Sequence, residues 1–201
     1  MYYAEGKLDK FIREKYFPDF DFKGVMIEVG AGTPEHISVS KHFRDTGWRC
    51  ICVEPNPKFV DAHTKKGNEI YQYACSNENK LGEFTIVNIP TWHKNENDGL
   101  SCSAIHPKYS IPPEAKVEKI EVEIITLSTL LSKISLENFD LISVDTEGWE
   151  LEVIQGLDLN KFTPKVIVLE NMGNPKYSEH MFKYGYLLDK QIEFNEIYYK
   201  K

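Results

Sequence analysis

Cysteine is scarce in this chain of 201 residues, and long apolar runs are missing. The four cysteines, Cys50, Cys52, Cys75 and Cys102, show no C-x-x-C spacing, so a zinc site and a disulfide framework are both poorly supported. No apolar run is long enough to span a membrane. The first residues carry charges throughout and lack the apolar core of a signal peptide, so a cytoplasmic location is expected.

An excess of positive charge is missing too. The chain has 24 Lys and Arg against 31 Asp and Glu, a net charge of −7, so neither nucleic acid nor a membrane is an expected partner. Its 41% hydrophobic and 27% charged residues are typical of a globular protein. The length predicts a single domain over residues 1–201, with residues 1–23 as an N-terminal helical extension. The oligomeric state stays open, with a homodimer as one alternative.

Short apolar strands alternate with helical patterns through most of the chain. The predicted strands cover residues 24–30, 49–55, 69–75, 118–126, 139–145 and 165–171. Residues 185–190 and 193–200 are predicted to form a closing C-terminal antiparallel strand pair. The pattern predicts an α/β, doubly wound fold with a mostly parallel sheet covered by helices.

The regular alternation breaks after a further predicted strand at residues 82–88. Residues 89–117 form a long polar stretch that contains four prolines. Loops of this length in a compact domain are usually functional or disordered. The stretch is therefore interpreted as a candidate substrate lid, with a mobile segment as the alternative.

Polar residues follow the predicted strands at the edge where such sheets bind ligands. Gly30, Ala31 and Gly32 form the first turn after Glu28, and Glu54 with Pro55 ends the second strand. Glycines let a ligand approach the backbone, and an acid at the second strand can bind both hydroxyls of a ribose. The simpler interpretations are close packing for the glycines and a solvated strand end for Glu54.

A nicotinamide dinucleotide is the less favoured cofactor. Its usual turn is G-x-G-x-x-G, but here Gly30 and Gly32 are followed by Glu35. A carboxylate at that position would repel a pyrophosphate.

Several segments between residues 25 and 199 together resemble the FkbM family of S-adenosylmethionine-dependent methyltransferases. The most specific is D-x-E-G-x-E-x-x-V/I-x-x-G, which is met by Asp145, Glu147, Gly148, Glu150, Val153 and Gly156. The resemblance implies a seven-stranded Rossmann-like sheet that binds S-adenosylmethionine. It implies that Glu28 and the turn lie near the methionine part, Glu54 near the ribose and Ser76 near adenine, with Asp145 also near the cofactor.

The family's acceptors are generally hydroxyls. The N/D-P-P-Y/F/W motif of enzymes that methylate amino groups is replaced here by "DTEGW" (residues 145–149), which disfavours methylation of bases. The sequence therefore predicts an O-methyltransferase that acts on a small hydroxylated acceptor, such as a sugar or secondary metabolite. The alternatives are a nicotinamide-dependent oxidoreductase and a non-catalytic domain that binds S-adenosylmethionine.

Methyl transfer to a hydroxyl requires removal of its proton, either by a base or with help from a metal ion. Asp145, Glu170 and Asn171 end neighbouring strands and offer oxygen ligands suited to Mg²⁺. This set resembles the metal site of catechol O-methyltransferase, where two acids and an asparagine hold magnesium. Helix capping and a surface ion pair are the structural alternatives. Without metal, one acid is expected to have a raised pKa and act as the base.

Three further residues are candidates for catalysis. Glu147 is expected to support the site or contact the acceptor. His93 and His180 are candidate bases, because their segments can reach the strand ends and histidine titrates near neutral pH.

Overall fold

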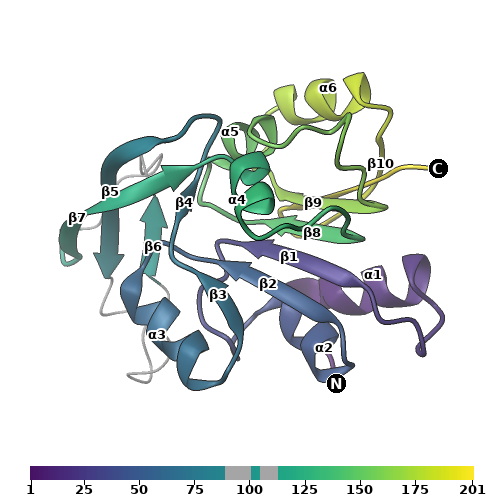
Figure 1. The fold of residues 1–201 in the computed structure, drawn as a ribbon, viewed down its shortest axis with the longest axis horizontal. Helices are drawn as coiled ribbons and strands as arrows, with labels where there is room; N and C mark the ends of the chain where they lie inside the picture. The colour runs from purple at the N-terminus through teal and green to yellow at the C-terminus, as the bar shows by residue number, and fades with distance from the viewer. Residues whose placement is uncertain (89–100, 105–112) are drawn as a thin grey trace.

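The computed structural model describes residues 1–88 and 113–201 and the backbone of residues 101–104 (Figure 1). His93 and most of the candidate lid at 89–117 lie outside the described residues. None of the helices in the described ranges has the length and apolar character needed to cross a lipid bilayer.

The larger of two sheets has seven strands in the order β10-β11-β9-β8-β1-β2-β3 (Figure 1). These strands are β1 (Val25–Val29), β2 (Arg49–Val53), β3 (Glu69–Tyr71), β8 (Leu141–Val144), β9 (Val166–Glu170), β10 (Leu187–Ile192) and β11 (Asn195–Tyr199). The strands from β9 to β3 pair in parallel, and the β10–β11 pair joins β9 antiparallel. The predicted seven-stranded, mostly parallel sheet with its closing antiparallel pair is therefore confirmed.

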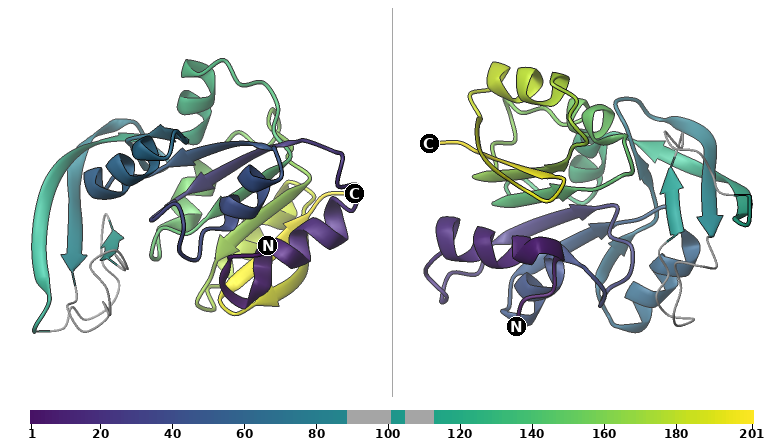
Figure 2. Two further views of the ribbon diagram at one scale, coloured as in Figure 1. Left: turned by 90° about the horizontal axis from the view of Figure 1, so that it is seen from below. Right: turned by 180° about the vertical axis from the view of Figure 1, so that it is seen from behind.

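Helices cover both faces of this sheet (Figure 2). They are η1 (Glu5–Lys7), α1 (Leu8–Tyr16), α2 (Val39–Asp45), α3 (Pro57–Lys65), α4 (Leu127–Lys133), α5 (Glu150–Gln155) and α6 (Lys176–Lys183). Alternation along β1 sends Met26 into the core with α1 and α2, and Ile27 into the core with α4, α5 and α6. This burial on both faces explains why the strands are apolar almost throughout.

A second, four-stranded sheet of order β4-β7-β5-β6 stands beside the main body (Figures 1 and 2). It contains β4 (Ala74–Cys75), β5 (Lys80–Asn88), β6 (Ser101–Ala104) and β7 (Lys116–Ile125). The predicted single strand at 69–75 is wrong, because its two ends, β3 and β4, join different sheets. β6 lies inside the range of the candidate lid and pairs with β5. Alternation predicts a strand but cannot show its partner, so the second sheet was missed.

Candidate functional site

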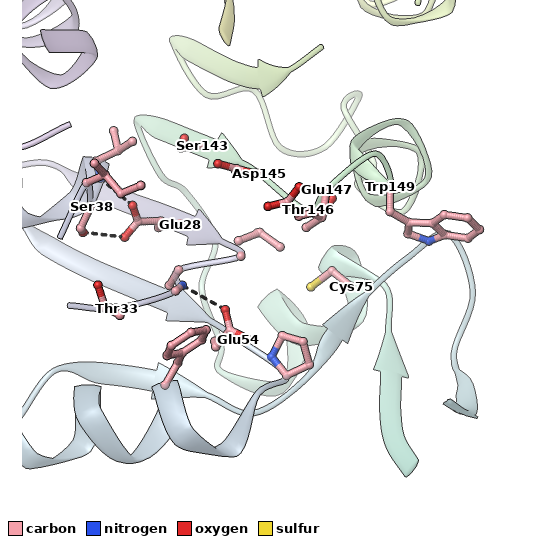
Figure 3. A pocket seen from close by; sticks show the side chains of 18 of the residues that line it. Glu28, Thr33, Ser38, Glu54, Cys75, Ser143, Asp145, Thr146, Glu147 and Trp149 are labelled. Atoms are coloured by element: carbon pink, nitrogen blue, oxygen red, sulfur yellow. Dashed lines mark hydrogen bonds between the residues drawn. The ribbon is translucent and has the colours of Figure 1, made fainter. Parts of the chain in front are cut away.

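A pocket opens at the carboxyl ends of β1, β2 and β8 (Figure 3). In the sheet, β2 lies on one side of β1 and β8 on the other, so the strand order reverses its direction here. This is the position at which doubly wound sheets bind ligands. Of the cofactor residues predicted from the sequence, the pocket is lined by Glu28, Gly30, Ala31, Gly32, Glu54, Pro55 and Asp145. Glu147 also lines it.

The two glycines of the first turn have different roles. Gly30 has a φ of 75°, and a Cβ there would lie 1.7 Å from the carbonyl oxygen of Asp145. Gly32 has a φ of 51°, but a Cβ there would meet no atom within 4 Å. Gly30 is thus required by close packing against the end of β8, whereas Gly32 leaves open space on the pocket side.

Glu54 ends β2 and is buried. Its carboxylate accepts a hydrogen bond of 3.0 Å from the backbone N–H of Gly32 (Figure 3) and one of 2.8 Å from the backbone N–H of Asn56. Burial raises the pKa of Glu54 to about 7, although the two backbone hydrogen bonds oppose this shift. The carboxyl is held in place at the pocket wall, with lone pairs remaining for a ligand.

Glu28 faces the start of α2. It accepts hydrogen bonds from the N–H groups of Val39 at 2.8 Å and Ser40 at 3.2 Å, and from the hydroxyls of Ser38 and Ser40. Arg44 lies 4.0 Å away. These contacts satisfy the exposed amides of the helix N-terminus, so Glu28 fixes α2 to β1 at the pocket wall.

Ser76, which the resemblance places near adenine, is not among the lining residues. It is buried, and its hydroxyl accepts a hydrogen bond of 3.1 Å from the indole N–H of Trp149. Trp149 itself lines the pocket together with Cys75 (Figure 3). Ser76 therefore reaches this region through the side chain of Trp149.

The turn after β8 is organised by Glu150, a residue to which the sequence assigned no role. One carboxylate oxygen of Glu150 accepts hydrogen bonds from the N–H groups of Thr146 at 2.8 Å and Gly148 at 2.9 Å. The other accepts one of 2.7 Å from the hydroxyl of Tyr177. Glu147 has a φ of 58° in this turn. The second glutamate of the D-x-E-G-x-E motif was the signal for this role.

Asp145 and Glu170 form a carboxyl pair at the ends of β8 and β9. Asp145 is exposed to the pocket, and its side chain hydrogen-bonds that of Glu170. The pKa of Asp145 is raised well above its ordinary value. The main cause is the loss of water around the carboxyl, and the negative charges of Glu170, Glu147 and Glu150 add to it. Burial and the charges of Glu147 and Glu150 raise the pKa of Glu170 to about 7. Adjacent like charges therefore disfavour the simultaneous ionisation of both groups.

The predicted metal ligands are only partly brought together. The side-chain amide of Asn171 bonds to the backbone of Asn174 from both ends, at 2.7 and 3.0 Å. Among the described residues, the carboxylates that cluster are those of Asp145, Glu150 and Glu170, with one oxygen of each within 4.8 Å of the others. Both oxygens of Glu150 already accept hydrogen bonds. The contacts therefore support a carboxyl pair of Asp145 and Glu170 better than a site in which three residues bind Mg²⁺.

His180 lies on α6, outside the lining of the pocket. Its ring lies 5.2 Å from that of Tyr184, and burial lowers its pKa. The structure does not bring it to Asp145, because the residues of α6 that face the core are Tyr177 and Met181.

The model of the methyltransferase FkbM domain matches residues 28–193 of this chain. Among solved structures, the chain is similar to a precorrin-6y C5,15-methyltransferase from Geobacter metallireducens, with 13% identity and a TM-score of 0.47. That alignment covers 95% of this chain and 88% of the other. A search of curated proteins gave no match.

Proposed function

Since the chain belongs to the methyltransferase FkbM domain family, we propose that it transfers a methyl group from S-adenosylmethionine to a hydroxyl of a small molecule or sugar. Membership of the family implies the cofactor. Transfer to oxygen, and the role of each residue, are the proposal.

The residues of the pocket suit this cofactor. Glu54 offers carboxylate oxygens for a ribose, next to the open space at Gly32. Pro55, Phe59 and Ala74 add apolar surface of the kind that packs against an adenine ring. Glu28 and the turn at Gly30 close the wall on the side of β1. When bound, S-adenosylmethionine supplies an electrophilic methyl group on a sulfonium.

The acid pair at the ends of β8 and β9 supplies the base, and this is the observation that carries the proposal. A hydroxyl is a weak acid, so the protein must take up its proton as the new bond forms. The raised pKa of Asp145, shared with Glu170, makes the ionised form of the pair a stronger base than an ordinary carboxylate. Asp145 faces the pocket, so it is the member that contacts the acceptor. As Asp145 takes up the proton of the hydroxyl, it passes the proton that it already holds to Glu170.

The test is methyl transfer by the wild type and by Asp145→Asn, each measured with EDTA and after addition of Mg²⁺. The wild type should keep its activity in EDTA, and Asp145→Asn should lose about 100-fold or more in kcat because the base is removed. Binding of S-adenosylhomocysteine, measured by calorimetry, should change little in the variant.

Three results would contradict parts of this proposal. Loss of wild-type activity in EDTA with recovery in Mg²⁺ would restore the predicted metal site. Full activity of Asp145→Asn would leave Asp145 as a structural residue. Binding of the cofactor without transfer to any hydroxyl, amine or thiol acceptor would favour the non-catalytic alternative.

A further inference from the structure

The acceptor side of the pocket includes two residues from outside the region that matches the family. Glu5 and Leu8, on η1 and α1, line the pocket with Asp145 and Glu147. The family match begins at residue 28. Glu5 also lies near enough to the acid pair for its charge to raise the pKa of Glu170. The N-terminal segment therefore contributes part of the pocket wall.

The N-terminal segment is held firmly in this position. Ala4 forms a parallel bridge with Ile37, which also lines the pocket. The N–H of Tyr3 donates a 2.6 Å hydrogen bond to Asp9. Leu8 and Ile12 are buried in the core formed with α2 and the sheet. Glu5 is thus a fixed part of the pocket and does not belong to a frayed end.

The charges around the pocket are almost all of one sign. The acids that line it are Glu5, Glu28, Glu54, Asp145 and Glu147. Its lining among the described residues contains no lysine or arginine, and His36 is its one basic side chain. A phosphate or carboxylate on the acceptor would be repelled here, with nothing in the described lining to neutralise it.

The acids do not all have the same partners. Glu28 and Glu54 each accept hydrogen bonds from backbone N–H groups and lie on the β1 and β2 side. Glu5 is exposed, and among the described residues its side-chain carboxylate has no hydrogen-bond or salt-bridge partner, although its backbone carbonyl accepts a hydrogen bond from the N–H of Leu8. Its carboxylate is available to a ligand that enters over the acid pair.

We propose that the acceptor carries a cationic group, such as an ammonium, beside the hydroxyl that is methylated, and that Glu5 binds this group. The inference rests on the proposed function, because it assigns the acceptor of the same pocket. It makes Glu5 a residue that determines specificity, and it excludes phosphorylated and carboxylated acceptors.

The experiment uses the whole chain saturated with S-adenosylhomocysteine. Two sets of hydroxylated probes each contain a cationic, a neutral and an anionic member. They are glucosamine, N-acetylglucosamine and glucose 6-phosphate, and dopamine, N-acetyldopamine and 3,4-dihydroxyphenylacetate. Dissociation constants are measured by calorimetry for the wild type, Glu5→Gln and Glu14→Gln. Glu14→Gln is the matched control, because this substitution removes the same charge from the same segment at a site outside this pocket.

In at least one set, the amine should bind about tenfold or more tightly than its acetylated partner, and the anion should bind least. Glu5→Gln should reduce the preference for the amine at least about threefold, and Glu14→Gln should keep it. Three results would overturn the inference. The acetylated or anionic probes could bind as tightly as the amines or more tightly, neither amine could bind, or Glu5→Gln could keep the preference of the wild type. If S-adenosylhomocysteine itself fails to bind, the proposed function is wrong, and this inference with it.

Discussion

The two sides of the pocket hold their acids in different ways. At the ends of β1 and β2, Glu28 and Glu54 accept hydrogen bonds from backbone N–H groups, which fix them as walls of the site. At the ends of β8 and β9, Asp145 and Glu170 bond to each other, and like charges surround them. Burial raises the pKa of acids on both sides, but backbone donors oppose this rise on the first side, whereas neighbouring acids add to it on the second.

The largest effect should come from a substitution that disrupts the close packing between these two sides. Gly30→Ala would place a Cβ at 1.7 Å from the carbonyl oxygen of Asp145, at a positive φ. We expect a loss of about 4 kcal/mol or more in the free energy of unfolding, measured by urea denaturation. Gly32→Ala is the control, because it has the same strained φ region but open space, and should cost only about 1–2 kcal/mol. Equal losses in the two variants would contradict the packing role of Gly30.

The next largest effect should come from the turn that presents Asp145. Glu150→Ala removes the acceptor for the N–H groups of Thr146 and Gly148 and for the hydroxyl of Tyr177. Unfolding should become easier by about 3 kcal/mol, because these donors lose their partner. Tyr177→Phe removes only one of these bonds and should cost about 1 kcal/mol. If Glu150→Ala proves no worse than Tyr177→Phe, the turn is not held by Glu150.

The third effect should be a dependence of stability on pH that arises from Glu54, on the cofactor side of the pocket. The pKa of Glu54 is about 7 in the folded protein against an ordinary value of 4.5, so the folded state holds its proton more tightly than the unfolded state. The stability from this group is therefore fully present below pH 4.5 and is lost as the pH rises through about 7. The loss should be on the order of 3 kcal/mol.

Glu54→Gln should flatten this decline, because the amide does not titrate. The measurement is the free energy of unfolding at several pH values between 4 and 8 for the wild type and the variant. Glu14→Gln is a surface control that should keep the wild-type slope. A wild-type slope that Glu54→Gln leaves unchanged would show that Glu54 titrates alike in the folded and unfolded states.

Local features of the sequence were enough to predict most of the larger sheet and one edge of the pocket. Apolar strands alternate with helices, and the carboxyl ends of parallel strands share an edge, so Glu54 and Asp145 could be placed together from their positions alone. The same reasoning failed for residues 69–75, because the strand breaks after Tyr71 and β4 joins another sheet. Strand pairing depends on partners that are distant along the chain.

The sequence by itself determined the alternation of strands and helices, the glycine turn and the family motif, because each is a pattern of neighbouring residues. Only the tertiary structure decided what each polar side chain contacts. It joined Asp145 to Glu170 across two strands, turned Asn171 toward Asn174, and used Glu150 to hold the turn. It also brought Glu5 to the pocket, because the buried face of α1 packs on the sheet and places the start of the chain beside β8 and β11. Such contacts depend on how distant segments pack, which no local pattern encodes.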